Sequence, residues 1–311
     1  MTFIKRFLEK FQIRHNPNLK TGDVVQVRSE NEILATLNGR GELEGLSFSE
    51  GMRKYCGKRF RVLKQVNKII VEGVGMRRMN KTVILEKAIC DGEAFNACRR
   101  TCHFLWKEKW LIKMGKKSGY NQSTDIQSGA EKTYLSSASL SVCQALNLLE
   151  ATSPFHPRDL HLYLSDIKSG AYSPIESFRV LLRVASAMFK GFLVRPRPEV
   201  KVEPGTTPTI SLNLQPGELV EIKSKDEILA TLDQNFKNRG LEFTAEMSKY
   251  CGKRYRVLRR LDKMYVEEAG IMRQITNTVL LDGVTCDGTE HAGCLRNCYC
   301  FCREIWVRRV Q

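Results

Sequence analysis

Long apolar runs and secretion signals are absent from this chain. No stretch approaches the roughly 20 apolar residues that a membrane-spanning helix needs, and the N-terminal residues lack the apolar core and small-residue cleavage site of a signal peptide. We therefore expect a cytoplasmic protein in a reducing compartment. There, its eleven cysteines would serve as metal ligands or buried thiols rather than as disulfides.

Familiar catalytic signatures are also absent. The sequence contains no P-loop, GxGxxG, GxSxG or HExxH motif. It has only five histidines, and acid–base catalysis most often uses histidine. These absences leave open whether the chain is an enzyme and favour a binding or scaffold protein.

What the chain does contain is the same module twice. GDVVQVRSENEILATLN, from Gly22, recurs as GELVEIKSKDEILATLD, from Gly217, and MRKYCGKRFRVLK, from Met52, recurs as MSKYCGKRYRVLR, from Met247. A spacing of about 195 residues indicates a duplicated domain, because solenoid repeats recur every ~20–50 residues. The sequence predicts four parts: a basic amphipathic N-terminal segment (1–21), copy one (22–114), a linker and helical spacer (115–216), and copy two (217–311).

Short β-branched runs between glycine turns predict strands within each copy. In copy one, they fall at residues 24–27, 59–62 and 82–85. Capping boxes predict a short helix after the first strand; their residues are Ser29 with Glu32, and Ser224 with Glu227. Because short strands in so small a module indicate a barrel, we expect a mainly β protein with an α spacer. Its form would be two small SH3-like antiparallel barrels joined by a helical segment.

The spacer has helical patterns of its own. Apolar residues at helical spacing predict a helix over 139–149, and a second short helix is expected to open at 157–160. Ser173 is a predicted N-cap, with Pro174 at the first helical position and Glu176 at the third. A long amphipathic, basic helix is expected to follow.

Four cysteines recur in register in each copy. The last three follow CDG-x5-C-x3-C, and the first lies in YCGK. Four thiolates are the ligand set of a tetrahedral zinc site or an iron–sulfur cluster, and a metal can stabilise a module with a limited core. The pattern predicts one zinc per module, with a [4Fe-4S] cluster or plain buried thiols as alternatives. The expected ligands are Cys56, Cys90, Cys98 and Cys102 in copy one, and Cys251, Cys286, Cys294 and Cys298 in copy two.

The remaining cysteines and two histidines are not expected to be ligands. Cys300 and Cys302 align with large aromatic residues of copy one, which indicates packing positions. Cys143 lies alone in an apolar helical pattern and is expected in a core, with a reactive thiol as the alternative. His103 and His291 have no counterpart in the other copy.

The net charge of +16 points to anionic partners. Copy one and the N-terminal segment carry most of the excess, so copy one is expected to present a basic face to nucleic acid or an acidic protein. An ordinary solvated surface is the alternative. The residues of this face are Lys58, Arg59, Arg61, Lys64, Arg77 and Arg78. The N-terminal segment, apolar on one side, is a candidate for peripheral membrane contact, for a partner groove, or for docking on the first barrel.

The GDVVQVRS opening of copy one resembles that of SH3-like barrels, including the KOW type, whereas copy two reads GELVEIKS. EILATL, YCGKR with the following RVL, and CDG with its trailing cysteines and tryptophan resemble a set of uncharacterised bacterial proteins with tandem cysteine-rich SH3-like modules. That resemblance covers both copies and implies no particular activity. We therefore predict a metal-stabilised tandem binding or scaffold protein. The alternatives are an iron–sulfur electron-transfer or maturation protein and an enzyme with a site between the modules.

Overall fold

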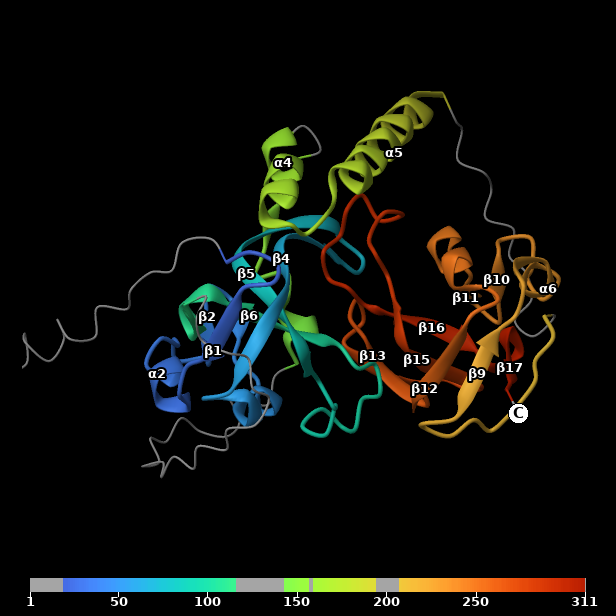
Figure 1. Ribbon diagram of the computed structural model, residues 1–311, viewed down its shortest axis with the longest axis horizontal. Helices are drawn as coiled ribbons and strands as arrows, with labels where there is room; N and C mark the ends of the chain where they lie inside the picture. The colour runs from blue at the N-terminus through green and yellow to red at the C-terminus, as the bar shows by residue number, and fades with distance from the viewer. Residues whose placement is uncertain (1–18, 116–142, 157–158, 194–206, 311) are drawn as a thin grey trace, which may run out of the picture.

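Two antiparallel sheets with the same strand order organise the structure, a computed structural model that describes residues 19–115, 143–156, 159–193 and 207–310 (Figure 1). Copy one lies on the left of the view, copy two on the right, and two helices of the spacer lie above them. The predicted mainly β architecture with antiparallel sheets and an intervening helical segment is confirmed. Most of the predicted N-terminal segment lies outside the described residues.

The sheet of copy one has the order β6-β5-β4-β1-β7, with β8 paired to β5. Its strands are β1 (Val24–Val27), β4 (Arg59–Val71), β5 (Gly75–Ile89), β6 (His103–Lys107), β7 (Leu111–Lys113) and β8 (Ser153–Pro154). The shorter elements are α2 (Glu30–Leu34), β2 (Glu42–Leu43), β3 (Leu46–Ser47), η1 (Glu50–Tyr55) and η2 (Glu108–Trp110). The long β4 and β5 curl the sheet into a half-barrel, and register shifts along their pairing mark the bulges that allow such bending.

Copy two repeats this plan with the order β16-β15-β12-β9-β17. Its sheet strands are β9 (Leu219–Ile222), β12 (Arg254–Arg260), β15 (Thr278–Thr285), β16 (Tyr299–Arg303) and β17 (Val307–Arg309). The other elements are α6 (Lys225–Leu229), β10 (Lys237–Asn238), β11 (Leu241–Glu242), η4 (Ala245–Tyr250), β13 (Lys263–Val266), β14 (Ile271–Gln274) and η5 (Glu304–Trp306). The hairpin β13–β14 is separate from the main sheet, whereas the corresponding residues of copy one continue β4 and β5.

Local signals of the sequence have the expected structural effect in both copies. Each predicted strand of copy one lies within β1, β4 or β5. Both capping boxes form, with Ser29 and Glu32 at the start of α2 and Ser224 and Glu227 at the start of α6. Each box satisfies backbone N–H groups that a helix start leaves without partners, so these two short helices begin at fixed residues.

Each copy has its own core around a tryptophan near the end of its sheet. Trp110 and Trp306 are fully buried. Their indole N–H groups donate to the hydroxyls of Thr36 and Thr231, over 3.0 and 3.1 Å. This matched pair of hydrogen bonds satisfies the one polar group that a buried tryptophan carries.

Of the three helices predicted in the spacer, two are present in the structure. The helix predicted over 139–149 is wrong for the described part, which contains only the 3-10 helix η3 (Gln144–Asn147). The next two helices are confirmed as α4 (Leu160–Ser169) and α5 (Pro174–Leu193). The predicted cap of α5 also forms, since the Ser173 backbone N–H donates to Glu176 over 2.8 Å and the Glu176 N–H donates to the Ser173 hydroxyl over 3.2 Å.

A buried ion pair attaches α4 to the sheet of copy one. The Lys68 ammonium of β4 contacts the carboxylate of Asp166, and their side chains are 0% and 1% exposed. Asp166 also accepts a hydrogen bond from Asn67 over 2.7 Å, and the ammonium lies 4.4 Å from the ring centre of Tyr163. The pair therefore holds α4 at a fixed position against β4.

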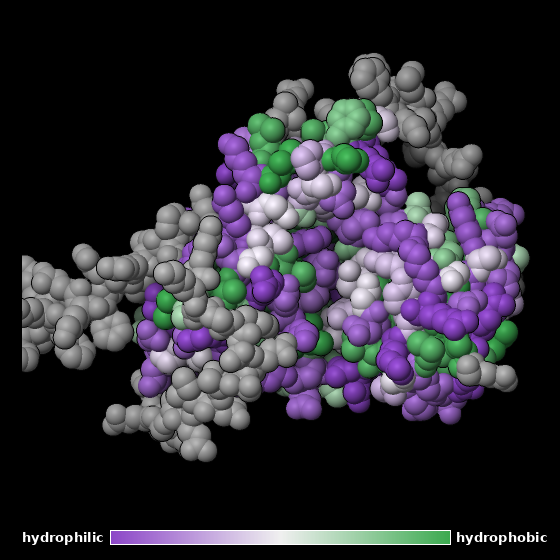
Figure 2. Space-filling model, in the orientation of Figure 1, coloured by the Kyte–Doolittle hydropathy of each residue, from purple (hydrophilic) through white to green (hydrophobic). Residues whose placement is uncertain are grey.

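Apolar side chains gather at the top of the molecule, over α4 and α5, while most of the visible surface is hydrophilic (Figure 2). Leu164, Ile175, Phe178 and Leu182 are all more than half exposed there. None of the described helices combines the length and apolar content needed to cross a membrane.

The two copies contact each other through equivalent residues. The Arg99 backbone N–H donates to the Lys263 carbonyl over 2.8 Å, and the Leu295 N–H donates to the Lys68 carbonyl over 3.2 Å. In the alignment, Arg99 corresponds to Leu295 and Lys68 to Lys263, so each copy gives and receives the same contact. This reciprocity is the property of a two-fold interface between identical subunits, here formed within one chain.

Candidate metal centre between the two copies

The CDG segment of each copy is folded into a tightly closed loop. Gly92 and Gly288 adopt φ values of +80° and +82°, and an added Cβ would lie only 1.7 and 2.0 Å from the carbonyl oxygens of Cys98 and Cys294. Glycine tolerates both the positive φ and the close backbone approach. The glycine therefore lets the chain fold back on the second cysteine of the CDG-x5-C-x3-C pattern.

A backbone hydrogen bond closes the base of each loop. The N–H of Cys90 donates to the carbonyl of Cys102 over 2.8 Å, and the N–H of Cys286 donates to that of Cys298 over the same distance. The loop thus brings the first and last cysteines of the pattern beside one another. This arrangement follows from local sequence and is the same in both copies.

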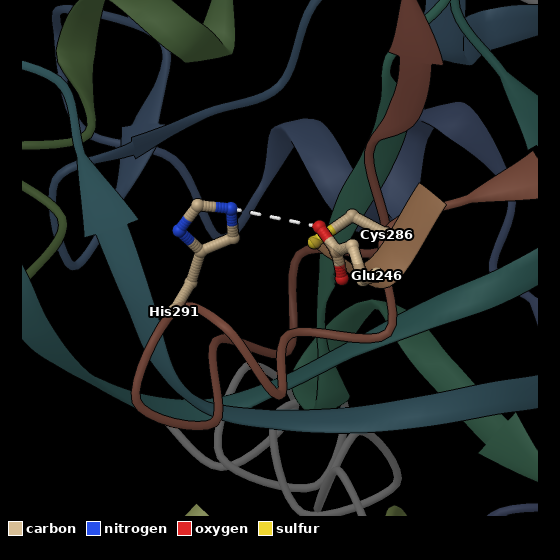
Figure 3. A group of neighbouring side chains, drawn as sticks. All are labelled: Glu246, Cys286 and His291. Atoms are coloured by element: carbon tan, nitrogen blue, oxygen red, sulfur yellow. Dashed lines mark ion pairs between the residues drawn. The ribbon is translucent and has the colours of Figure 1, made fainter. Parts of the chain in front are cut away.

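In copy two, the loop meets two further ligand-type side chains. Glu246 comes from η4, Cys286 follows β15, and His291 lies in the loop itself. Their potential ligand atoms all lie within 4.8 Å of one another, and His291 Nε2 is 3.6 Å from Glu246 Oε1 (Figure 3). This is the only such group of three or more histidine, cysteine or acidic side chains in the part of the chain that the structure describes.

Burial shifts the protonation of two members of this group. The Glu246 side chain is only 2% exposed, and burial raises the pKa of its carboxyl group. Burial also raises the pKa of the Cys286 thiol, as does the neighbouring Glu246. Because metals bind the deprotonated forms, a cation that binds here must displace these protons.

The group opens into a cavity of about 430 Å³ that both copies line. Ile70, Glu72 and Arg100 come from copy one, and the backbone N–H of Ile70 donates to the Cys294 sulfur over 3.3 Å. The cysteines of copy two on its wall are Cys286, Cys294, Cys298 and Cys300. The side chain of His291 is 42% exposed, so the group is accessible from solvent.

The donor set suits a transition metal. Sulfur, imidazole nitrogen and carboxylate oxygen are the three ligand types of protein-bound zinc, and three protein ligands with an open position are typical of catalytic rather than structural sites. Comparison with protein-family models, curated proteins and solved structures finds no match for this chain. The chemistry of the site therefore rests on its own geometry.

Copy one lacks this group. Gly51 and Phe95 occupy the positions of Glu246 and His291 in the alignment, so only Cys90 remains of the three. Glu246 went unrecognised in the sequence, and His291 was not expected to be a ligand, because a comparison of the copies emphasises shared residues and neither is shared. The signal that could have revealed His291 is its position five residues after Cys286, within a cysteine-rich loop.

The structure divides the eight cysteines predicted as ligands. Cys90, Cys98 and Cys102 line one small cavity of about 30 Å³, and their counterparts Cys286, Cys294 and Cys298 line the larger one. Cys56 and Cys251 line neither; they follow η1 and η4 and pack against the cores of their own copies. Among the described residues, no three sulfur atoms of either predicted set lie mutually within 4.8 Å. One zinc or [4Fe-4S] cluster per module stays a prediction.

The basic residues of copy one do not all face solvent. Lys64 lies against the Tyr172 ring, 5.3 Å from its centre, and burial lowers the pKa of its ammonium. Arg77 donates to the carbonyl of Thr152 over 2.9 Å, which holds the segment before α4, and the Nε atom of Arg78 is buried. Lys58 is exposed, and Arg59 and Arg61 are partly exposed. A partner surface on copy one, if confined to accessible side chains, is smaller than the sequence indicates.

Proposed function

We propose that this protein is a metal-stabilised tandem binding or scaffold protein, and that copy two holds one zinc ion through Glu246, Cys286 and His291. The observation that carries this proposal is the mutual distance of their ligand atoms, all within 4.8 Å. The ligands come from η4, the end of β15 and the CDG loop, so an ion would connect three segments of copy two. It would also stabilise the wall of the cavity that copy one shares.

The fourth coordination position would face the cavity. In a zinc site with three protein ligands, this position holds a water molecule or a bound group. We propose that the scaffold uses it for a donor atom of its partner. A partner bound in the larger cavity, which both copies line, would then contact both copies at once.

We also propose that each copy is an SH3-like barrel. In support, the last strand of each copy pairs with the first, as β7 does with β1 and β17 with β9. These pairings add the last strand at one edge of each sheet, beside the first strand. An experimental structure of the protein tests this, since sheets too flat to bring β6 near β7 and β16 near β17 would reject the barrel.

His291→Phe is the sharpest test of the zinc site, because phenylalanine is the residue that copy one carries at this position. Removal of one of three ligands should lower the zinc content of the purified protein by about one equivalent. It should also weaken zinc affinity by at least ~10–100-fold, because that loss is typical even when a residue that only hydrogen-bonds to a ligand is removed. Metal analysis and competition with a chelator measure both quantities. His156→Phe, at an exposed histidine outside the group, is the control. Unchanged zinc content in His291→Phe would reject the proposal.

A further inference from the structure

Four cysteine side chains line the small cavity of copy one, and one of them comes from the spacer. Cys90, Cys98 and Cys102 belong to the CDG loop, and Cys143 directly precedes η3. The spacer occurs once in the chain, so the pattern shared by the two copies gives no information about Cys143. Only the three-dimensional structure places Cys143 beside the CDG loop.

Buried hydrogen bonds hold Cys143 at this place. The neighbouring Gln144 is 7% exposed. Its side chain accepts from the N–H of Leu105 over 3.0 Å, and donates to the carbonyls of Leu105 and Ser47 over 3.0 and 2.8 Å. Leu105 lies in β6, three residues after Cys102. The glutamine thus anchors the spacer to the strand that follows the loop.

We propose that Cys90, Cys98, Cys102 and Cys143 form a second metal site, a four-thiolate site for a single soft divalent cation such as zinc. Four thiolates are a standard closed, structural set of zinc ligands. The cavity of about 30 Å³ has room for little more than one or two water-sized groups. It therefore suits one ion rather than a multi-atom iron–sulfur cluster.

The four sulfur atoms lie further apart than the ligands of a zinc ion. No three of these sulfur atoms lie mutually within 4.8 Å, whereas Zn–S bonds of ~2.3 Å bring tetrahedral sulfur ligands closer together than that. Binding would draw the side chains inward by rotation about their Cα–Cβ bonds. All four side chains line the same small cavity, so the movement would converge on one place.

Two arginine side chains lie beside the cavity. Arg100 and Arg296 both line it, and their side chains are only 10% and 9% exposed. Both guanidinium groups also pair with the carboxylate of Glu267. One arginine comes from each copy, so the site would lie where the spacer and both copies meet.

Each copy would therefore add different ligands to those of its CDG loop. Copy two adds Glu246 and His291 to Cys286, whereas copy one receives Cys143 from the spacer. The inference does not rest on the proposed function, because the two sites share no ligand. It assigns a closed, structural type of site to copy one and an open type to copy two.

Cobalt titration of the full reduced chain under anaerobic conditions tests the assignment. The wild-type protein should bind two equivalents, with strong sulfur-to-cobalt charge-transfer absorption. Cys143→Ser should lose one equivalent and most of that absorption, whereas the matched variant Cys56→Ser should keep both. His291→Phe should lose the other equivalent and keep most of the absorption. Loss in Cys56→Ser with full retention in Cys143→Ser would overturn the inference, and unchanged binding in His291→Phe alone would reject only the site in copy two.

A second measurement requires no substitution. Alkylation of the native protein with and without zinc, read by mass spectrometry, should show that zinc protects Cys90, Cys98, Cys102 and Cys143 together, while Cys56 reacts at the same rate in both states. Equal reaction of Cys143 with and without zinc would overturn the inference. Gln144→Leu should weaken cobalt binding at this site by about 10–100-fold, as loss of a supporting residue does, and leave the site in copy two unchanged.

Discussion

His103 and Tyr299 occupy equivalent positions of the two copies and stack on each other across the contact. Their ring centres are 5.8 Å apart and their planes differ by 8°. Nε2 of His103 lies 3.2 Å from the amide nitrogen of Asn297. Burial, together with the nearby Lys64 cation, lowers the pKa of His103 from 6.5 to about 4. At neutral pH, His103 is therefore an uncharged aromatic ring at the module contact.

This shift predicts an acid sensitivity of the fold. Between about pH 6.5 and 4, the unfolded chain binds a proton at His103 that the folded chain does not, so stability present above pH 6.5 is lost as pH falls toward 4. The loss should reach about 3 kcal/mol, at ~1.4 kcal/mol per pH unit. Urea unfolding of the metal-free protein across this range, compared with His103→Phe, measures it. If the unfolding free energies of the two proteins changed in parallel with pH, the prediction would be contradicted, because the folded chain would then bind a proton at His103 as readily as the unfolded chain.

At the scale of elements, the CDG loops position their cysteines with very little secondary structure. Each loop lies between two sheet strands, β5 and β6 in copy one and β15 and β16 in copy two. The register of each strand pair shifts at this point, which leaves room for the loop above the sheet. A closed loop on a curled sheet therefore presents three cysteines from a short stretch of chain.

Gly92→Ala should open this loop, and Gly57→Ala is its matched control. Both glycines have positive φ, 80° and 75°, but an added Cβ meets the Cys98 carbonyl at Gly92 and nothing within 4 Å at Gly57. The control should lose about 1–2 kcal/mol of unfolding free energy for the left-handed backbone. Gly92→Ala should lose at least ~4 kcal/mol, the range of exceptional substitutions. Equal losses in urea unfolding would show that the loop relaxes around the new methyl group.

At the scale of the whole molecule, four charged side chains occupy the contact between the copies. Arg100 pairs with Glu72 over 2.7 Å and with Glu267 over 3.1 Å. Arg296 also binds Glu267, whose side chain is only 2% exposed. Glu72 and Glu267 are equivalent positions, as are Arg100 and Arg296. The ion pairs themselves are asymmetric among the described residues, because both arginines pair with Glu267 whereas Glu72 pairs with Arg100 alone.

Glu267→Ala should therefore loosen the whole assembly. It leaves two largely buried guanidinium groups without their shared carboxylate, and removal of one partner from a buried ion pair costs about 3–5 kcal/mol. The adjacent Glu268 is exposed, so Glu268→Ala should change stability by less than about 0.5 kcal/mol. Thermal unfolding and limited proteolysis measure the two variants. A loss in Glu267→Ala no larger than in Glu268→Ala would contradict the role of the network.

Local features of the fold could be read from the sequence because their causes lie close together in the chain. Ser29 and Glu32 are three residues apart and cap their helix as expected, and short β-branched runs at 59–62 and 82–85 predicted strands that lie within β4 and β5. The repeat also indicated two similar sheets. The helix expected over 139–149 failed because Gln144 is held by the backbone of β6 and Ser47, and hydrogen bonds to a distant strand are invisible in a window of sequence.

The candidate sites were predicted only in part for a related reason. Comparison of the copies selects residues needed by the shared loop, which are Cys90, Cys98 and Cys102 and their counterparts. It also selected Cys56, whose place against the core of copy one explains its recurrence equally well. A proposed ligand that only one copy has, such as His291 or Cys143, has no matching ligand-type residue to compare and is found only when distant segments are placed in space.

The reciprocal contact between the copies also bears on how the protein behaves on dilution. Two separate modules with such a contact would dissociate as their concentration fell, whereas modules joined in one chain keep a constant effective concentration of each other. The interface cavity, with Cys286 and His291 on its wall, would then be complete in every single molecule. A cell that contained few copies of this protein would still have every site assembled.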